Sequence, residues 1–395
     1  MKPSGAWLGL LGGGQLGRMF VHAAQRLGYR VLVLDPEVDC PAAQVADDAL
    51  VAAYDDAAAL AELARRCVAA TTEFENVPAH ALAQLARHID VAPRADVVAV
   101  AQHRAAEKRL FESCGVPAAP HAVIESAADV GRIDVTALLP GIVKTCTLGY
   151  DGRGQRRVAT RADVAAALHE LAVPCVLERK LSIATEVSVV VARGRDGATV
   201  AYPVAENRHR DGILALTVLP GRVDAALAER ARDAALAVIR RLDYVGVLCV
   251  EFFVLADGTL IANEIAPRPH NSGHATIEAC VTSQFEQQVR VVAGLPLGDV
   301  GLRSPAVMLN LLGEVWCSGR RPDWGAVLAT PGTSLHLYGK TVARNGRKMG
   351  HVTCVGDSPE TALARARRVA DALRIDAFSD AVATQGSGST AAAGT

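Results

Sequence analysis

The sequence predicts a chain of mixed α/β and α+β class, in which two different architectures follow one another. Residues 6–35 have the order strand, glycine turn, helix and strand, which is typical of a βαβ unit in a parallel sheet. Residues 186–266 instead hold apolar strand runs joined by short polar turns, a pattern that favours antiparallel pairing. The length of 395 residues exceeds what one compact core holds, so we expect two or three domains.

The first predicted domain spans residues 1–102 and is of the α/β type. Its opening unit contains a helix with Met19, Ala23 and Leu27 on one face. Two fainter helix–strand units follow, at residues 57–74 and 79–93. Alternating helices and strands of this kind predict a parallel sheet.

The second predicted domain spans residues 103–298, and its part at about 120–182 forms a smaller subdomain. The last two strands of the domain form a hairpin around an Asp-Gly turn. The expected elements are helices at 104–114, around 127, 161–171 and 225–242, and strands at 141–145, 175–181, 186–194, 199–207 and 245–267.

The third predicted domain spans residues 299–378 and is rich in strands. It holds strand runs at 305–313, 334–340 and 349–356 and a last helix at 359–373. The tail, 379–395, consists almost entirely of Gly, Ser, Ala and Thr, so we expect it to be disordered.

Composition excludes several classes of function. Lys and Arg (41) almost cancel Asp and Glu (42), which leaves no basic footprint for nucleic acid or an anionic membrane. Glu251 interrupts the longest apolar run, and the N-terminus lacks the apolar core of a secretory signal, so we expect a soluble cytoplasmic protein. Nine scattered cysteines without a C-x-x-C pair argue against a disulfide framework and a zinc site.

A glycine turn near the N-terminus matches the dinucleotide-binding pattern G-x-G-x-x-G. Gly12, Gly14 and Gly17 lie between a strand and a helix, and Asp35 ends the following strand. In that context a phosphate binds at the helix N-terminus and the acidic residue binds a ribose hydroxyl. The same turn can hold another anion or only pack a helix closely on a strand. An NAD-dependent dehydrogenase is therefore one alternative.

A second candidate phosphate site lies in the middle of the chain. Lys144 ends a strand and precedes the glycine-rich polar loop 149–155, whose backbone N–H groups can lie over phosphates. Only six of the 41 basic residues are lysine, which favours a specific role for an ammonium group here. A solvated hairpin tip is the structural alternative.

The hairpin at 245–267 supplies a candidate metal site. Glu251 and Glu264 flank its turn, with Asn263 beside the second, and oxygen ligands near phosphates suit Mg²⁺. Because Glu251 interrupts an apolar strand, where an unpaired charge is costly, a metal role is favoured over a surface carboxylate. The loop that follows, 266–276, is crowded with groups suited to anion binding and proton transfer: Arg268, His270, Asn271, Ser272 and His274.

These stretches together resemble the 5-(carboxyamino)imidazole ribonucleotide synthases, a family of ATP-grasp ligases in purine biosynthesis. The HNSGH segment is the most specific, since the related formate-dependent glycinamide ribonucleotide transformylases share APRPH but differ after it. The matching stretches are GGGQLGRM (12–19), TEFENVP (72–78), GYDGRGQ (149–155), HRDGIL (209–214), NEIAPRPHNSGH (263–274) and GRKMGH (346–351).

The resemblance implies an ATP-grasp fold with an N-terminal Rossmann-like pre-ATP-grasp domain and a small C-terminal β-rich domain. It also implies that bicarbonate and ATP form carboxyphosphate, which carboxylates 5-aminoimidazole ribonucleotide (AIR), with Mg²⁺ as cofactor and a homodimer as the assembly. Formate transfer to glycinamide ribonucleotide remains an alternative within the fold, and a non-enzymatic nucleotide-binding regulator remains one outside it.

The resemblance also assigns roles to particular residues. Glu251 and Glu264 would bind Mg²⁺, and Arg268, His270 and Asn271 would lie where bicarbonate meets AIR. ATP would contact Arg104, Lys144, Gly149, Tyr150, Asp151, Gly152, Arg153, Gly154, Gln155, Glu178, Arg179, Lys180, Leu181, Glu186, His209, Asn263 and Glu264. AIR would contact Gln15, Glu73, Glu75, Tyr150, Asp151, Lys340, Arg347 and Lys348.

Overall fold

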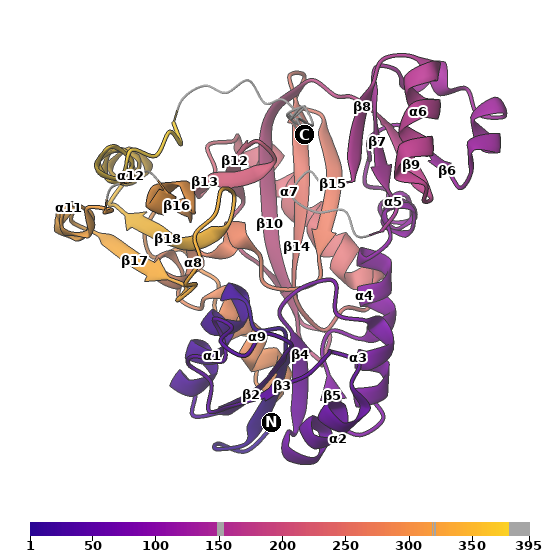
Figure 1. The fold of residues 1–395 in the computed structure, drawn as a ribbon. Coiled ribbons are helices and arrows are strands. Elements are labelled where there is room, and N and C mark those ends of the chain that lie inside the picture. The colour runs from indigo at the N-terminus through magenta and orange to yellow at the C-terminus, as the bar shows by residue number, and fades with distance from the viewer. Residues whose placement is uncertain (148–153, 318, 320, 379–395) are drawn as a thin grey trace.

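The computed structural model describes residues 1–147, 154–317, 319 and 321–378. Most of the predicted glycine loop, Gly149–Arg153, and the tail 379–395 lie outside these residues. Three sheets organise the described chain, and Figure 1 shows the largest of them between the other two.

The N-terminal sheet has the strand order β3-β2-β1-β4-β5, and all of its pairings are parallel. This confirms the predicted βαβ opening; β3 and α4 were not anticipated. The strands are β1 (Trp7–Leu11), β2 (Arg30–Asp35), β3 (Asp48–Val51), β4 (Ala69–Thr72) and β5 (Asp90–Val91), and the helices are α1 (Gln15–Arg26), α2 (Ala57–Arg66), α3 (Ala79–Leu85) and α4 (Ala95–Ala101).

A small four-stranded sheet follows, in the order β6-β9-β7-β8. Thr160 caps α6 in a capping box with Asp163, which explains why that helix begins where the sequence predicts. The elements of this part are α5 (Arg104–Ser113), β6 (His121–Ile124), the 3₁₀ turns η1 (Ala127–Gly131) and η2 (Val135–Leu138), β7 (Gly141–Thr145), β8 (Gln155–Val158), α6 (Arg161–Leu171) and β9 (Cys175–Arg179).

The central sheet runs in the order β15-β14-β10-β12-β13-β16-β18-β17, with β11 paired to β10. The predicted hairpin is confirmed as β14 and β15. The elements are β10 (Ile183–Arg193), β11 (Thr199–Ala201), β12 (Ala205–Arg210), β13 (Ile213–Leu219), α7 (Ala225–Arg241), β14 (Gly246–Leu255), β15 (Leu260–Ala266), η3 (Asn271–Gly273), α8 (Thr276–Ala279) and α9 (Gln284–Ala293).

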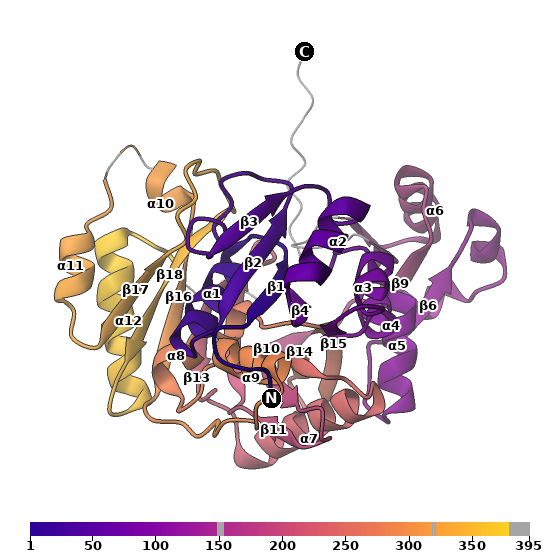
Figure 2. The same cartoon turned by 90° about the horizontal axis from the view of Figure 1, so that it is seen from below.

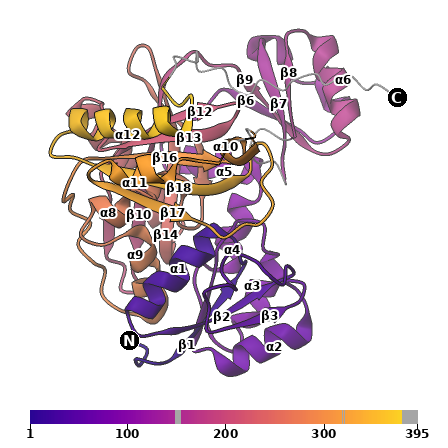
Figure 3. The same ribbon diagram turned by 60° about the vertical axis from the view of Figure 1, so that its left-hand side comes forward.

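The C-terminal strands extend the central sheet, because β16 pairs with β13. The predicted boundary at residue 299 therefore separates strands that hydrogen-bond to one another, and the domain boundaries stay a prediction. Helix α12 lies along these strands (Figure 3). The elements are β16 (Ala306–Leu312), α10 (Glu314–Cys317), α11 (Trp324–Ala329), β17 (Thr333–Leu337), β18 (Lys348–Val355) and α12 (Pro359–Leu373).

Helices α1 and α9 join the N-terminal and central sheets. Phe20 and Val21 of α1 pack with Val289 and Val292 of α9 in one buried cluster that includes residues of β1 and β2. Figure 2 shows the two helices beside the N-terminal strands. Removal of this apolar surface from water stabilises the junction. Within the described part of the chain, no helix is long and apolar enough to cross a membrane.

Candidate active site

The central sheet has one apolar and one polar face at β10 and β14. Strand residues alternate between the two faces. On one face Val187, Val250 and Phe252 are fully buried in a core cluster with α5 and α7. On the other, Ser188 lies opposite Glu251 in the register, so polar side chains share this face. The sequence VLCVEFFV thus places Glu251 away from the core.

A bulge at Asn263 brings the second carboxylate to the same face. Glu251 pairs with Glu264, but the next position, Phe252, pairs with Ala262, so β15 holds one extra residue. Without it, Ala262 and Glu264 would share a face by simple alternation, and Glu264 would point into the apolar core. The bulge therefore sets the two predicted metal ligands side by side.

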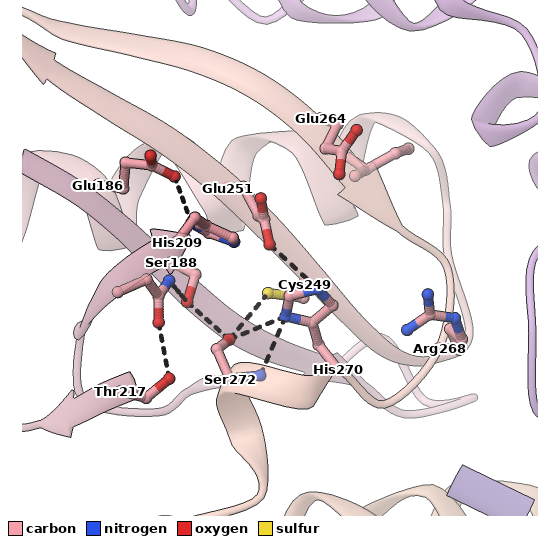
Figure 4. Close-up of polar contacts among 12 residues, drawn as sticks. Glu186, Ser188, His209, Thr217, Cys249, Glu251, Glu264, Arg268, His270 and Ser272 are labelled. Atoms are coloured by element: carbon pink, nitrogen blue, oxygen red, sulfur yellow. Dashed lines mark hydrogen bonds and ion pairs between the residues drawn. The ribbon is translucent and has the colours of Figure 1, made fainter. Parts of the chain in front are cut away.

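Two histidines lie against carboxylates on this polar face (Figure 4). Nε2 of His270 is 3.0 Å from Oε1 of Glu251, and Nδ1 of His209 is 2.7 Å from Oε2 of Glu186. Burial lowers the pKa of His209, but the carboxylate of Glu186 outweighs burial and holds the pKa above its usual value. Burial likewise opposes protonation of His270, while Cys249 and Glu251 raise its pKa.

A buried hydrogen-bond chain orients the ring of His270 through Nδ1, the nitrogen that does not face Glu251. Thr217 donates to Asn207 (3.0 Å), Asn207 donates to Ser188 (2.8 Å), and the hydroxyls of Ser188 and Ser272 are 2.7 Å apart. Ser272 Oγ lies 2.9 Å from Nδ1 of His270 (Figure 4). Ser188, Asn207 and Thr217 were not predicted from the sequence, although polar residues at buried positions of apolar strands are a signal for such a chain.

Asn271 is buried, and neither its amide oxygen nor its amide nitrogen has a hydrogen-bond partner among the described residues. An unsatisfied buried amide is costly unless a ligand or water completes it. Asn271 begins η3, directly after His270. Its position therefore fits a residue that contacts substrate.

A second group of predicted residues lies between α5 and the small sheet. Nζ of Lys144 is 2.7 Å from Oε2 of Glu178, and Nη1 of Arg104 is 3.6 Å from Oε2 of Glu264. Burial tends to raise the pKa of Glu178, but the ammonium groups of Lys144 and Lys108 outweigh it and lower that pKa. Lys108, to which the sequence analysis assigned no role, is 2.9 Å from Oε1 of Glu178.

The remaining predicted ATP residues are distributed along the same sheet. Gln155 pairs with Lys144 in the register of β7 and β8, and Gly154 adopts a φ of +68° just before it. Arg179 and Lys180 are exposed at the end of β9, whereas Leu181 is buried beside Phe253. The predicted contacts of Gly149, Tyr150, Asp151, Gly152 and Arg153 fall outside the described residues.

The glycine turn holds a carboxylate of the protein itself. The N–H groups of Gly14 and Gly17 donate to the two carboxylate oxygens of Glu73, at 2.9 and 3.1 Å. A Cβ at Gly14 would come within 2.5 Å of Glu73, so the glycine is required for this approach. Asp35 accepts from the N–H of Gly13 and from Tyr54. This end of α1 is therefore occupied in the way an anionic ligand would occupy it.

The predicted AIR residues connect the N-terminal and C-terminal parts. Arg268 Nε lies 2.6 Å from Oε2 of Glu75. Lys340 donates to Gln15 and to the carbonyl of Lys348, each at 2.8 Å. Burial lowers the pKa of Lys340 to about 8, helped by the nearby charge of Arg347.

The fold and site together define an ATP-grasp ligase. Residues 109–285 match the ATP-grasp domain family, residues 6–102 the ribonucleotide synthetase preATP-grasp domain, and residues 306–365 the phosphoribosylaminoimidazole carboxylase C-terminal domain. The chain belongs to the family of N5-carboxyaminoimidazole ribonucleotide synthases, which confirms the resemblance and the predicted fold class.

Three relatives illustrate this membership. The N5-carboxyaminoimidazole ribonucleotide synthase of Brucella melitensis is 47% identical over 360 residues, which cover 89% of this chain and 97% of the relative. A crystal structure of the ADP complex of a synthetase of this name has a TM-score of 0.87 at 41% identity, covering 93% and 96%. The Aspergillus clavatus enzyme in complex with ADP and 5-aminoimidazole ribonucleotide has a TM-score of 0.85 at 32% identity, covering 94% and 99%.

Proposed function

We propose that this protein carboxylates AIR with bicarbonate at the expense of ATP, giving 5-carboxyaminoimidazole ribonucleotide, ADP and phosphate in purine biosynthesis. The observation that carries the proposal is the position of the HNSGH loop. His270 of this loop contacts Glu251, and Glu251 lies opposite Glu264 in the strand register. The loop is also the segment in which the formate-dependent transformylases differ. The glycine turn offers little to a dinucleotide, because Glu73 already binds its N–H groups.

The carboxylate pair suits Mg²⁺. Magnesium is usually bound by one or two carboxylates together with substrate phosphates and water, rather than by a cage made only of protein groups. The register places Glu251 and Glu264 opposite each other, and no cluster of three or more acidic, His or Cys ligands occurs in the described part of the chain. When bound there, Mg²⁺ would offset the charge that develops on the transferred phosphoryl group.

The nucleotide would lie between the small sheet and this carboxylate pair. Lys144 and Arg104, which lie beside Glu178 and Glu264, would bind its phosphates, and the loop 149–155 would cover them. Backbone groups of Glu178 to Leu181 would bind adenine, and Glu186 would bind the ribose hydroxyls. Asn263 and His209 lie beside Glu264 and Glu186 and would complete the site.

The first chemical step joins bicarbonate to phosphate. A bicarbonate oxygen forms a bond to the γ-phosphorus while the bond from that phosphorus to the ADP oxygen breaks, giving carboxyphosphate and ADP. Arg268 is our candidate for stabilising the developing charge. Because carboxyphosphate is unstable in water, the loop 149–155 should close before it forms.

The second step transfers the carboxyl group. The exocyclic amine of AIR forms a bond to the carboxyl carbon as phosphate leaves, directly or after release of CO₂, and the amine loses one proton. His270 is our candidate for assisting removal of this proton, with Asn271 beside it. Because its raised pKa favours the charged ring, His270 would act through its ion pair with Glu251, whose carboxylate would accept the Nε2 proton. Lys340, Arg347 and Lys348 would bind the 5′-phosphate, and Gln15, Glu73, Glu75, Tyr150 and Asp151 would face the rest of AIR.

We further propose that the protein is a cytoplasmic homodimer whose partners are these small molecules rather than nucleic acid or a membrane. The balance of acidic and basic residues argues against nucleic acid and anionic membranes as partners, and membership of the family supports the homodimer. Size-exclusion chromatography with light scattering tests the assembly. A monomer would contradict it.

An ADP-release assay tests the proposed function. Purified protein is given MgATP with bicarbonate or formate, and with AIR or glycinamide ribonucleotide. We expect ADP release only with bicarbonate and AIR. Release with formate and glycinamide ribonucleotide would favour the transformylase reaction, nucleotide binding without turnover would favour a regulator, and a change in NADH fluorescence on binding would favour a dehydrogenase.

A further inference from the structure

One buried carboxylate faces two lysines at the edge of the proposed ATP site. Glu178 contacts Lys144 through Oε2 at 2.7 Å and Lys108 through Oε1 at 2.9 Å. All three residues are buried, with exposures of 3%, 5% and 2% for Glu178, Lys144 and Lys108. Buried lysines are rare unless they are paired, and the chain contains only six lysines. The burial of Lys108 therefore calls for a functional or structural explanation.

The fold builds this cluster from three segments. In the register of β7 and β9, Ile142 lies opposite Glu178, so Lys144 is a diagonal neighbour of Glu178 on the same face. Helix α5 covers that face, because its Ala105 packs against Val176 of β9.

Helix α5 is tied to both sheets around the cluster. Lys108 lies three residues after Ala105 on the same side of the helix, which directs it toward β9. The first residue of α5, Arg104, donates its backbone N–H to the carbonyl of Cys146 just after β7. Glu107, next to Lys108, accepts the backbone N–H of Ile265 in β15 at 2.6 Å. The position of Lys108 is thus fixed by contacts on either side.

The charges in the cluster do not cancel. Two ammonium groups face one carboxylate, which leaves one net positive charge in a site with little water. With Lys144 and Glu178 alone, the pair would be neutral, and a phosphate would have to compete with Glu178 for Lys144. Burial lowers the pKa of Lys144, Glu178 opposes this effect, and the positive charges of Arg104 and Lys108 lower the pKa further.

We propose that Lys108 is a positioning residue for nucleotide phosphates, which neutralises Glu178 so that the charge of Lys144 is available to the phosphates. When Lys144 turns to a phosphate, Lys108 keeps Glu178 from becoming an unpaired buried carboxylate, which would be strongly destabilising. The inference rests on the proposed function in one respect, the assignment of Lys144 as the phosphate cation. It adds a residue that touches neither substrate nor metal.

A charge cycle separates this role from simple packing. The variants are Lys108→Met, which leaves the cluster neutral, Lys108→Arg, which keeps its charge, and Lys108→Met with Glu178→Gln, which restores one net positive charge. Binding of MgADP is measured by calorimetry and KM for ATP and for AIR by ADP release. The wild-type protein is measured first. If it shows no AIR-dependent ADP release, the proposed function is contradicted, whereas the proposed role of Lys108 is not.

We expect Lys108→Met to weaken MgADP binding and raise KM for ATP by about tenfold or more, with KM for AIR little changed. Lys108→Arg should bind MgADP within about threefold of wild type, and the double variant should bind it more tightly than Lys108→Met. If Lys108 contributed only packing, removing the charge of Glu178 would not restore MgADP binding.

Two results would overturn the inference. One is wild-type MgADP affinity in Lys108→Met, and the other is a double variant as weak as the single one. If Lys108→Met does not fold, as judged by circular dichroism, the double variant decides, since it carries the wild-type net charge without a buried ion pair. Loss of its MgADP binding would then overturn the inference.

Discussion

The glycine turn and the polar face of the central sheet both hold carboxylates against hydrogen-bond donors, but the donors differ. At the turn, Glu73 and Asp35 accept from backbone N–H groups of Gly13, Gly14 and Gly17. On the central sheet, Glu251 contacts the side chain of His270 and Glu186 that of His209. Backbone donors are fixed by the turn and helix to which they belong, whereas side chains can rotate to other partners.

This difference separates structural anion binding from a site that can exchange partners. A substrate could displace Glu73 only by leaving its carboxylate without the N–H groups of Gly14 and Gly17. On the central sheet, a ligand can replace one side-chain contact with another at little cost to the fold. The glycine pattern resembles a nucleotide site in sequence, yet the exchangeable contacts lie elsewhere in the chain. The comparison predicts that carboxylate substitutions impair turnover at one region and stability at the other.

Glu264→Gln should have the largest effect. The side chain of Glu264 is 44% exposed, so the fold should tolerate the change, but an amide is a poor ligand for Mg²⁺ beside Glu251. We expect AIR-dependent ADP release to fall about a thousandfold or more. The matched control is Glu229→Gln on the exposed side of α7. Normal turnover in Glu264→Gln would rule out the metal assignment.

His270→Ala should lower the rate of carboxylation about a hundredfold, because it removes the group proposed to assist proton removal. Product formation and ADP release are measured together under saturating ATP and AIR. His270→Asn is the control, since its amide can still donate to Glu251 but cannot take a proton. A near-normal rate in His270→Ala would remove the catalytic role, and recovery in His270→Asn would reduce it to positioning of Glu251.

Much of the fold could be predicted because its signals are local. Helices α6 and α12 begin and end within one residue of their predicted bounds, since Thr160 and Ser358 cap their first turns. The βαβ opening follows from the glycine turn and its flanking apolar runs. Strand β3 was missed because its four residues are half-exposed and carry no clear alternation.

The sequence allowed the residues of the site to be predicted, but not the contacts between them. The spacing of Glu251 and Glu264 indicates a metal pair, yet the bulge at Asn263 that sets them on one face depends on strand pairing. Lys108 meets Glu178 across 70 positions of sequence, and no local pattern reports such a contact. Glu73 reaches Gly14 across 59 positions, so its capping of α1 was equally invisible.

Glu73→Gln should mainly reduce stability, because both carboxylate oxygens are held by the glycine turn although the side chain also borders the proposed AIR site. The amide can accept through only one atom, so one of the N–H groups of Gly14 and Gly17 loses its partner in a partly buried position. We expect a loss of about 1–2 kcal/mol in the free energy of unfolding, measured in urea. The exposed Glu229→Gln again serves as the control. Unchanged stability would show that the turn does not need its carboxylate, and the contrast between the two regions would be lost.

The smallest expected effect is a pH dependence at Lys340, which reaches from the C-terminal part to Gln15 beside the glycine turn. Its pKa of about 8 means that the ammonium loses its proton as the pH rises through 8. A phosphate binds the charged form, so KM for AIR should rise severalfold, by about two to five times, between pH 7 and 9.

The free energy of unfolding should increase with pH above 8, while the affinity for AIR falls. The folded protein holds fewer protons on Lys340 than the unfolded chain between pH 8 and the ordinary lysine value of 10.5, so the contribution of Lys340 to stability increases with pH there. Lys340→Arg keeps its charge throughout and should flatten the rise in KM. If Lys340→Arg and wild type show the same pH dependence of KM, another group is responsible, and Lys340 belongs with the fixed contacts of the glycine turn rather than with the exchangeable ones.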